Sequence, residues 1–401
     1  MNDGRRREYR RRLFFCESSC RYTGAEMTGR ERILAVLSGQ VPDCVPVSPD
    51  FSNMIPARLT GKEFWDLYLY KDPPVWEAYI DCAKHFDIDV LMDGYFPLSF
   101  PDPCEPEWQE FIVSRNDERI VTQKSYVDAG KRIWSRTASV YYPSNPRSYG
   151  MDLAKLGLPP TPERFEPVEP RRDVDTGPDG FKRIKNLLGD QGLIGVPVTG
   201  SCVISTEEEL FRYVDNPDKH EQWAAERVVA AEKRFEQVMS MDVKPDFICV
   251  GGSGTLVLQT VEIFRQLALP AVKRAIELAT AAGMPTHVHS CGPESQLVKI
   301  FAEETDLTVI DPLEIPPMGD CDLAEMKRLY GDKIVLKGNL HTTDVMLRGS
   351  VEDVVSASKK AIDDAGRGGG FILSTGDQCG RDTPDENLRA MVETARTYGK
   401  Y

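Results

Sequence analysis

The chain has 401 residues, of which 41% are hydrophobic and 28% charged, as in a soluble globular protein. Its formal net charge of −14 excludes a general affinity for nucleic acid or for an anionic membrane surface. No apolar run approaches the roughly 20 residues that cross a bilayer. The ten cysteines follow no disulfide framework, so we expect a reducing cytoplasm in which most of them are buried thiols.

Residues 1–26 differ from the rest of the chain. They hold seven arginines against four acidic residues, and the apolar part of RRREYRRRLFF is too short for a signal peptide. We interpret them as a disordered basic extension, since MTGRERILAVLSG from Met27 onward is typical of a protein start. A chain that begins at Met27 is therefore expected to keep its melting temperature and its activity. A clear drop in either quantity would show that the extension packs on the rest of the protein.

From Met27 onward, the sequence predicts short buried strands that alternate with amphipathic helices. A helix over 350–366 illustrates the pattern, with Ser350 as its N-cap and Gly366 at its end. Two strands are predicted upstream of residue 100, and six follow after residue 190. The eight are CVPVSPD (44–50), IDVLMDG (88–94), GLIGVPVTG (192–200), DFICVGGSG (246–254), PTHVHSC (285–291), DLTVIDP (306–312), KIVLKGN (333–339) and GFILSTG (370–376).

This alternation predicts parallel strands joined by crossover helices. Eight strands fit a closed (β/α)8 TIM barrel better than an open sheet, and no G-x-G-x-x-G follows any of them. Residues 100–190 break the rhythm with a hairpin pattern and a proline-rich loop. We therefore predict a single α/β barrel domain over 27–401, with an insertion between strands two and three. The insertion fits a substrate lid and a decorative excursion equally well.

Polar residues gather at the predicted carboxyl ends of the strands, where the active sites of such barrels lie. His289 and Cys291 share one face of their strand, because alternate side chains of a strand point the same way. Cys379, after the last strand, is the third metal ligand that we predict, and Cys321 is the alternative. His287 lies one step deeper and is expected to be hydrogen-bonded inside the barrel. Imidazole and thiolate ligands with an open fourth position are typical of catalytic zinc.

Four further residues at the strand ends are candidate catalytic groups. They could donate a proton to a departing oxygen or supply a fourth zinc ligand, or they could simply cap and hydrogen-bond the strand ends. Asp93 and Asp377 rank below them. The four candidates are Asp311, Glu314, Asn339 and His341.

Three stretches carry a family resemblance: LALPAVKRAIELATAAGMPTHVHSCG, LKGNLHTTDVMLRGSVEDVV and GDQCGRDTPDENL. In them, and from Met27 to the C-terminal helix, the chain resembles the uroporphyrinogen decarboxylase superfamily. Within it, the chain is similar to the zinc-dependent methyltransferases that work with corrinoid proteins. An H-x-C followed far downstream by a Cys resembles the zinc signature of methylcobamide:coenzyme M methyltransferases. That signature falls on His289, Cys291 and Cys379, and it implies Zn2+ as the metal.

The departures from the family narrow the function. The decarboxylase clamps porphyrin carboxylates with an arginine-rich stretch, whereas PVSPDFSNMIPARLTG has only Arg58. No D-x-H-x-x-G corrinoid-binding pattern occurs, and GNLHTTD around His341 does not match it. The resemblance thus implies methyl transfer between a methoxylated aromatic or a thiol and the cobalt of a separate corrinoid (cobalamin) protein.

Two alternatives to methyl transfer stay open. One is a decarboxylase-like lyase that acts on another carboxylic acid, and the other is a non-catalytic subunit that binds a corrinoid protein. The direction of methyl transfer also stays open, and a homo-oligomer is compatible with the sequence.

Overall fold

The computed structural model describes residues 26–102 and 104–401. The predicted basic extension lies outside the described residues except for Glu26. The described chain forms two compact units. The first consists of residues up to 50 with 83–96 and 185–401, and the second of 51–82 and 97–184. The second unit therefore includes chain that precedes the predicted insertion.

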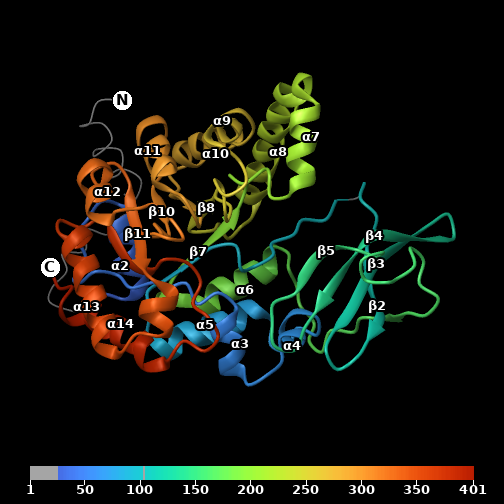
Figure 1. Ribbon diagram of the computed structural model, residues 1–401, viewed down its shortest axis with the longest axis horizontal. Helices are drawn as coiled ribbons and strands as arrows, with labels where there is room; N and C mark the ends of the chain where they lie inside the picture. The colour runs from blue at the N-terminus through green and yellow to red at the C-terminus, as the bar shows by residue number, and fades with distance from the viewer. Residues whose placement is uncertain (1–25, 103) are drawn as a thin grey trace. The chain divides into compact units, whose positions relative to one another are not determined.

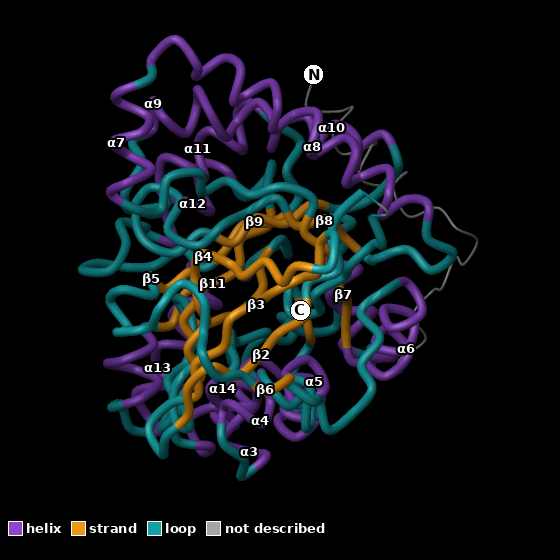
Figure 2. Tube along the Cα trace, turned by 90° about the vertical axis from the view of Figure 1, so that its right-hand side faces the viewer, coloured by secondary structure: helices purple, strands orange, loops and turns teal. Residues whose placement is uncertain are grey.

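The first unit is a mixed α/β structure with a curled sheet of seven parallel strands (Figures 1 and 2). Their order is β1-β7-β8-β9-β10-β11-β12, so strands neighbouring in sequence are neighbours in space within this unit. Figure 2 shows helices outside the strands, with α8 and α10 beyond β8 and β9. The strands are β1 (Val90–Met92), β7 (Gly192–Pro197), β8 (Phe247–Cys249), β9 (Thr286–His289), β10 (Val309–Asp311), β11 (Val335–Leu340) and β12 (Phe371–Thr375).

The eighth strand, predicted over 44–50, is not confirmed. Val47 makes an isolated parallel bridge with Leu373 of β12, and Cys44 makes an isolated antiparallel bridge. Pro46 and Pro49 lack the N–H that a ladder needs, which interrupts a regular strand. The segment still hydrogen-bonds on both sides, since Ser48 N donates to Leu373 O (2.8 Å) and Val47 O accepts from Asp89 N (2.8 Å).

Helices connect the strands of the first unit, and their caps follow the sequence. Thr28, Thr206 and Ser350 each form a capping box, which confirms the predicted N-cap at Ser350. Helices α5 (Val75–Phe86) and α6 (Pro178–Leu188) contribute to both units. The described helices that lie in the first unit alone are α2 (Gly29–Leu37), α7 (Glu207–Asp215), α8 (His220–Ser240), α9 (Val261–Ile263), α10 (Leu269–Ala281), α11 (Ser295–Glu304), α12 (Leu323–Tyr330), α13 (Val351–Ala361) and α14 (Asp385–Thr397). The described part of this unit also has short 3-10 or π turns at η1 (Gly189–Gln191), η2 (Pro217–Lys219), η3 (Phe264–Ala268), η4 (Thr342–Leu347) and η5 (Ile362–Gly366).

Helix α2 packs against the amino ends of the strands. Its Ile33, Val36 and Leu37 form one buried cluster with residues near the starts of six strands, among them Phe247 and Val309. This packing removes large apolar side chains from water at the amino ends of the strands. The carboxyl ends of the strands are thereby left for polar residues.

The second unit holds a five-stranded antiparallel sheet in the order β5-β4-β3-β2-β6. The predicted hairpin corresponds to β3 and β4, which pair from Ile120 with Tyr141 to Asp128 with Lys131. Three more strands extend it on both sides, so the region is larger than a hairpin. The elements of this unit are α3 (Met54–Thr60), α4 (Phe64–Tyr68), β2 (Gln109–Arg115), β3 (Ile120–Asp128), β4 (Lys131–Tyr141), β5 (Ser148–Asp152) and β6 (Glu166–Pro167).

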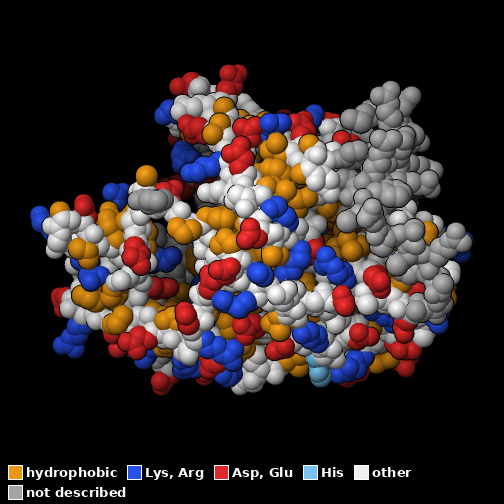
Figure 3. All heavy atoms as spheres, turned by 180° about the vertical axis from the view of Figure 1, so that it is seen from behind, with side chains coloured by type: hydrophobic (Ala, Val, Ile, Leu, Met, Phe, Trp, Pro, Cys, Tyr) orange, Lys and Arg blue, Asp and Glu red, His pale blue; other side chains and the backbone are white. Residues whose placement is uncertain are grey.

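The surface of the protein carries charged side chains of both signs. Lys and Arg side chains are interspersed with Asp and Glu over the face drawn in Figure 3. No helix in the described residues is both long and apolar enough to cross a membrane. The eight cysteines within the described chain are all free thiols.

The acid stability of the first unit is expected to depend on Asp246. Its buried carboxylate contacts Arg30 (2.5 Å) and Lys185 (2.9 Å). Burial raises its pKa, but the bond from Arg30 and the charge of Lys185 outweigh burial and lower the pKa overall. A lowered pKa stabilises the folded state above the unfolded value of about 4, and this contribution is lost as the pH falls below it.

We therefore expect Asp246→Asn to be less stable than the parent protein at pH 7. The difference in unfolding free energy should shrink as the pH falls below about 4. Urea unfolding at a series of pH values measures it. A difference that stays constant down to the acid limit would mean that Asp246 contributes through packing rather than charge.

Candidate metal centre

The carboxyl end of β9 brings a histidine and a cysteine to the same place. Strand β9 ends at His289, and the chain turns at Gly292, whose φ is +92°. Gly251 after β8 lies so close to β9 that a Cβ would come within 2.4 Å of His289 N. Gly251, the first glycine of the GGSG stretch, therefore allows close packing of the two backbones beside the site. The next residue adds a hydrogen bond, since Gly252 N donates to His289 O (2.9 Å).

His289, Cys291 and Asp377 form a cluster of possible metal ligands. One ligand atom from each lies within 4.8 Å of the others, and His289 Nε2 is 3.7 Å from Asp377 Oδ1. Asp377 Oδ1 is buried without a hydrogen-bond partner among the described residues. Burial raises the pKa of Asp377 to about 6, and the nearby carboxylates of Asp50 and Glu314 add to this rise against the attraction of His289.

Cys379 does not belong to this cluster in the structure. Its side chain is fully buried, its N–H donates to Asp50 O (2.8 Å), and burial raises the pKa of its thiol to about 12. Strand β12 ends at Thr375, so the strand alternation that relates His289 to Cys291 does not extend to the loop. Asp377 has φ +103°, and in this loop its carboxylate, not the thiol two residues later, lies beside His289.

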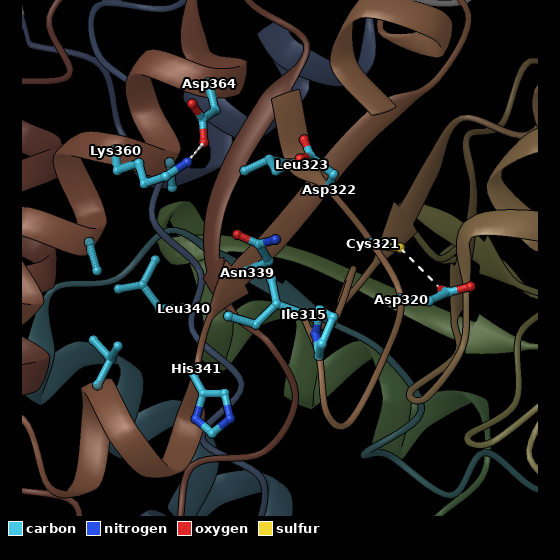
Figure 4. A pocket seen from close by; sticks show the side chains of 14 residues that line it. Ile315, Asp320, Cys321, Asp322, Leu323, Asn339, Leu340, His341, Lys360 and Asp364 are labelled. Carbon is cyan, nitrogen blue, oxygen red and sulfur yellow. Dashed lines mark hydrogen bonds and ion pairs between the residues drawn. The ribbon is translucent and has the colours of Figure 1, made fainter. Parts of the chain in front are cut away.

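Cys321, the alternative ligand, also lies outside the cluster. Its thiol is buried, and burial raises its pKa well above the usual range. It lines a pocket of about 410 Å³ between the loop after β10, the end of β11 and helix α13 (Figure 4). None of the three clustered residues lines this pocket. The pocket thus lies apart from the candidate metal ligands.

Asp311 is the candidate catalytic residue that contacts the cluster of possible metal ligands. It ends β10 directly beside His289 in the parallel register. Its Oδ1 is 2.8 Å from His287 Nε2 and 3.4 Å from His289 Nδ1. Burial raises the pKa of Asp311, but the charges of Lys337 and the two histidines outweigh burial and lower it well below its usual range. His287 is hydrogen-bonded in the interior, as the sequence predicted.

Glu314 holds the loop that carries Cys291. Its Oε2 accepts a hydrogen bond from Gly292 N (2.5 Å), the residue after the cysteine. Glu294, which the sequence analysis did not single out, lies nearby as a second buried acid, and its Oε2 accepts from Leu313 N (2.7 Å). Burial raises the pKa of Glu294 well above its usual range.

Asn339 and His341, the other two candidates, line the pocket of Figure 4. The Asn339 amide donates to Leu313 O (3.0 Å). His341 caps η4, because its Nδ1 accepts from Thr343 N (3.2 Å) and Asp344 N (2.9 Å). In the neutral ring, the proton is therefore on Nε2. Both residues have the strand-end and capping contacts that the sequence left open as their role.

Comparison with known proteins places the chain in a family context. Residues 240–398 match the sequence model of the uroporphyrinogen decarboxylase family. A methylcobamide:CoM methyltransferase of Methanosarcina mazei is 31% identical over 137 residues, which are 34% of this chain and 37% of that protein. The resemblance to the uroporphyrinogen decarboxylase superfamily is confirmed. The chain spans little more than a third of the length of this relative.

Two further proteins resemble the chain, one in sequence and one in fold. A uroporphyrinogen decarboxylase of Anaeromyxobacter dehalogenans is 24% identical over 241 residues, covering 57% of this chain and 66% of that protein. A solved methyltransferase structure from Methanosarcina mazei superposes with a TM-score of 0.57 at 16% identity. That superposition covers 93% of this chain and 99% of the other, and it shows that the two share a fold.

Proposed function

We propose that this protein is a zinc-dependent methyltransferase that works with a separate corrinoid protein. It moves a methyl group between the corrinoid cobalt and a small substrate, either a thiol or a methoxylated aromatic compound. Zn2+ is bound by His289, Cys291 and Asp377. The observation that carries the proposal is this three-residue cluster at the carboxyl ends of β9 and β12, in a chain whose relatives include methylcobamide:CoM methyltransferases.

The donor set suits zinc in its chemistry, and one of its distances is close to that of a tetrahedral site. Imidazole nitrogen, thiolate sulfur and carboxylate oxygen are its usual ligands, and tetrahedral coordination separates them by roughly 3.3–3.6 Å. The observed 3.7 Å between His289 Nε2 and Asp377 Oδ1 is close to that spacing. A bound cation would also satisfy the buried Asp377 Oδ1. Three protein ligands leave a fourth position for the group that reacts.

The residues around the cluster have separable roles. Asp311 faces His289 Nδ1 and so directs Nε2 toward the cluster, as carboxylates do behind zinc-bound histidines. Glu314 holds the backbone beside Cys291. Zinc in an open three-ligand site acidifies or polarises the group at its fourth position. Asn339 and His341 offer an amide and an Nε2–H to a ligand in the separate pocket of Figure 4.

Methyl transfer is tested with the zinc-loaded protein in both directions. Methylcobalamin with thiols should yield cob(I)alamin, and cob(I)alamin with methoxylated aromatic compounds should yield methylcobalamin, which absorbance spectra distinguish. Cys291→Ala should abolish either reaction. Cys104→Ala is the matched control, because this cysteine is exposed and lies in the second unit.

The same assays separate the alternatives. Release of carbon dioxide from uroporphyrinogen or another acid, without methyl transfer, would establish a lyase. Tight binding of a corrinoid protein without turnover in either direction would establish a binding subunit. The single arginine, Arg58, in the segment where the decarboxylase clamps porphyrin makes the first outcome unexpected.

A further inference from the structure

Lys337 is a buried lysine inside the seven-stranded sheet. It lies in β11, where only 5% of the residue is exposed, between apolar neighbours of the run KIVLKGN. Its Nζ pairs with Asp311 Oδ2, and the charges of Asp93 and Asp50 act on it as well. A buried ion pair rarely stabilises a fold more than apolar residues of the same size would. Fold stability alone therefore does not account for a lysine at this position.

The partner of Lys337 is Asp311, whose carboxylate contacts His289 of the cluster of possible metal ligands. Asp311 Oδ1 is 2.8 Å from His287 Nε2 and 3.4 Å from His289 Nδ1, while Oδ2 faces Lys337. Phe247 packs against the edge of the His287 ring with centroids 5.8 Å apart, which restricts that ring too. Lys337, Asp311 and His289 thus form one chain of contacts that ends at the proposed zinc ligand.

We propose that Lys337 is a positioning residue for the metal centre. By holding Asp311 Oδ2, it fixes the orientation of Oδ1, and Oδ1 in turn holds His289 with Nε2 toward Cys291 and Asp377. The inference rests on the proposed zinc centre. Without the ammonium group, the carboxylate can rotate, and the imidazole loses its fixed direction. An imidazole that is already held in the ligand orientation binds the metal without the entropic cost of ordering its side chain.

The first test measures metal affinity in Lys337→Met, which keeps the length and most of the volume of the side chain. Zinc affinity, measured by competition with a chromophoric chelator, should fall about 10–100-fold, as for other groups that support metal ligands. The absorption spectrum of the Co2+-substituted protein should change, since it reports ligand geometry. Lys337→Arg keeps the charge and should recover part of the affinity.

A double-mutant cycle tests whether Lys337 acts through Asp311. Asp311→Asn should weaken zinc binding by itself, and adding Lys337→Met should weaken it by no more than about twofold further. The double variant leaves no unpaired buried charge, so it should fold even where Lys337→Met does not. Additive losses would show that Lys337 acts independently of Asp311 and would overturn the proposal.

A metal-free measurement separates this inference from the zinc proposal. The chain has five histidines, so 15N-labelled imidazole signals can be assigned by single substitutions. The Nδ1–H signal of His289 should be sharp and protected from exchange in the parent protein, and broadened in Lys337→Met. A parent protein that fails to bind zinc would refute the metal centre while leaving this test in force. Unchanged imidazole signals with only a lower melting temperature would show that Lys337 is merely structural.

Discussion

Asp377→Ala is expected to lower zinc affinity by at least about 100-fold and to remove methyl transfer with it. Loss of a supporting residue behind a metal ligand already costs about 10–100-fold, and loss of a ligand costs more. Asp377 supplies the buried oxygen beside His289, whereas the thiol of Cys379 lies outside the cluster. Cys379→Ala should therefore keep most of its zinc.

Zinc content after dialysis and chelator competition distinguish the two loop residues. Asp377→Asn, which preserves the shape of the side chain, should lose affinity nearly as strongly as the alanine variant. His289→Ala gives the reference for removal of a ligand. The opposite ranking, with zinc lost in Cys379→Ala and kept in Asp377→Asn, would restore the cysteine that the sequence signature suggested.

Asp89→Ala is expected to destabilise the first unit by about 3–5 kcal/mol, the cost of breaking a buried ion pair. The Asp89 side chain is buried and joins segments far apart in sequence. Its carboxylate accepts hydrogen bonds from Arg32 of α2 (3.1 Å), from Arg396 of α14 (2.7 and 2.9 Å) and from Val47 N (2.8 Å). Removing it leaves two buried or half-buried guanidinium groups without this partner.

Urea or thermal unfolding measures the Asp89 effect against an exposed ion pair. Arg265 and Glu304 are 2.6 Å apart but half exposed, so Glu304→Ala should cost no more than about 1 kcal/mol. Equal effects of the two substitutions would show that the Asp89 network does not tie the ends of the chain together. The double variant Arg396→Met with Asp89→Asn should recover part of the loss.

The local pattern of the sequence predicted the strands and one part of the site. Alternation within β9 predicted that His289 and Cys291 face the same way, and the structure has both in one cluster. The regular alternation of apolar runs and helices predicted parallel strands, because each run is buried on both faces and is followed by an amphipathic helix. The four candidate catalytic residues were chosen by their position at predicted strand ends, and their catalytic role stays a prediction.

Only the tertiary structure decided which other residues lie beside His289 and Cys291. Asp377 and Cys379 lie in a loop, where no period relates side-chain direction to position, and a left-handed backbone at Asp377 determines which of them faces His289. Lys337 is a single charged residue in an apolar run, and its partner is 26 positions away along the chain. Val47 pairs with Leu373 across the first and last parts of the first unit. Short-range patterns determine strands and helices because they depend on neighbouring residues, whereas loop direction and long-range charge pairs depend on how the elements pack.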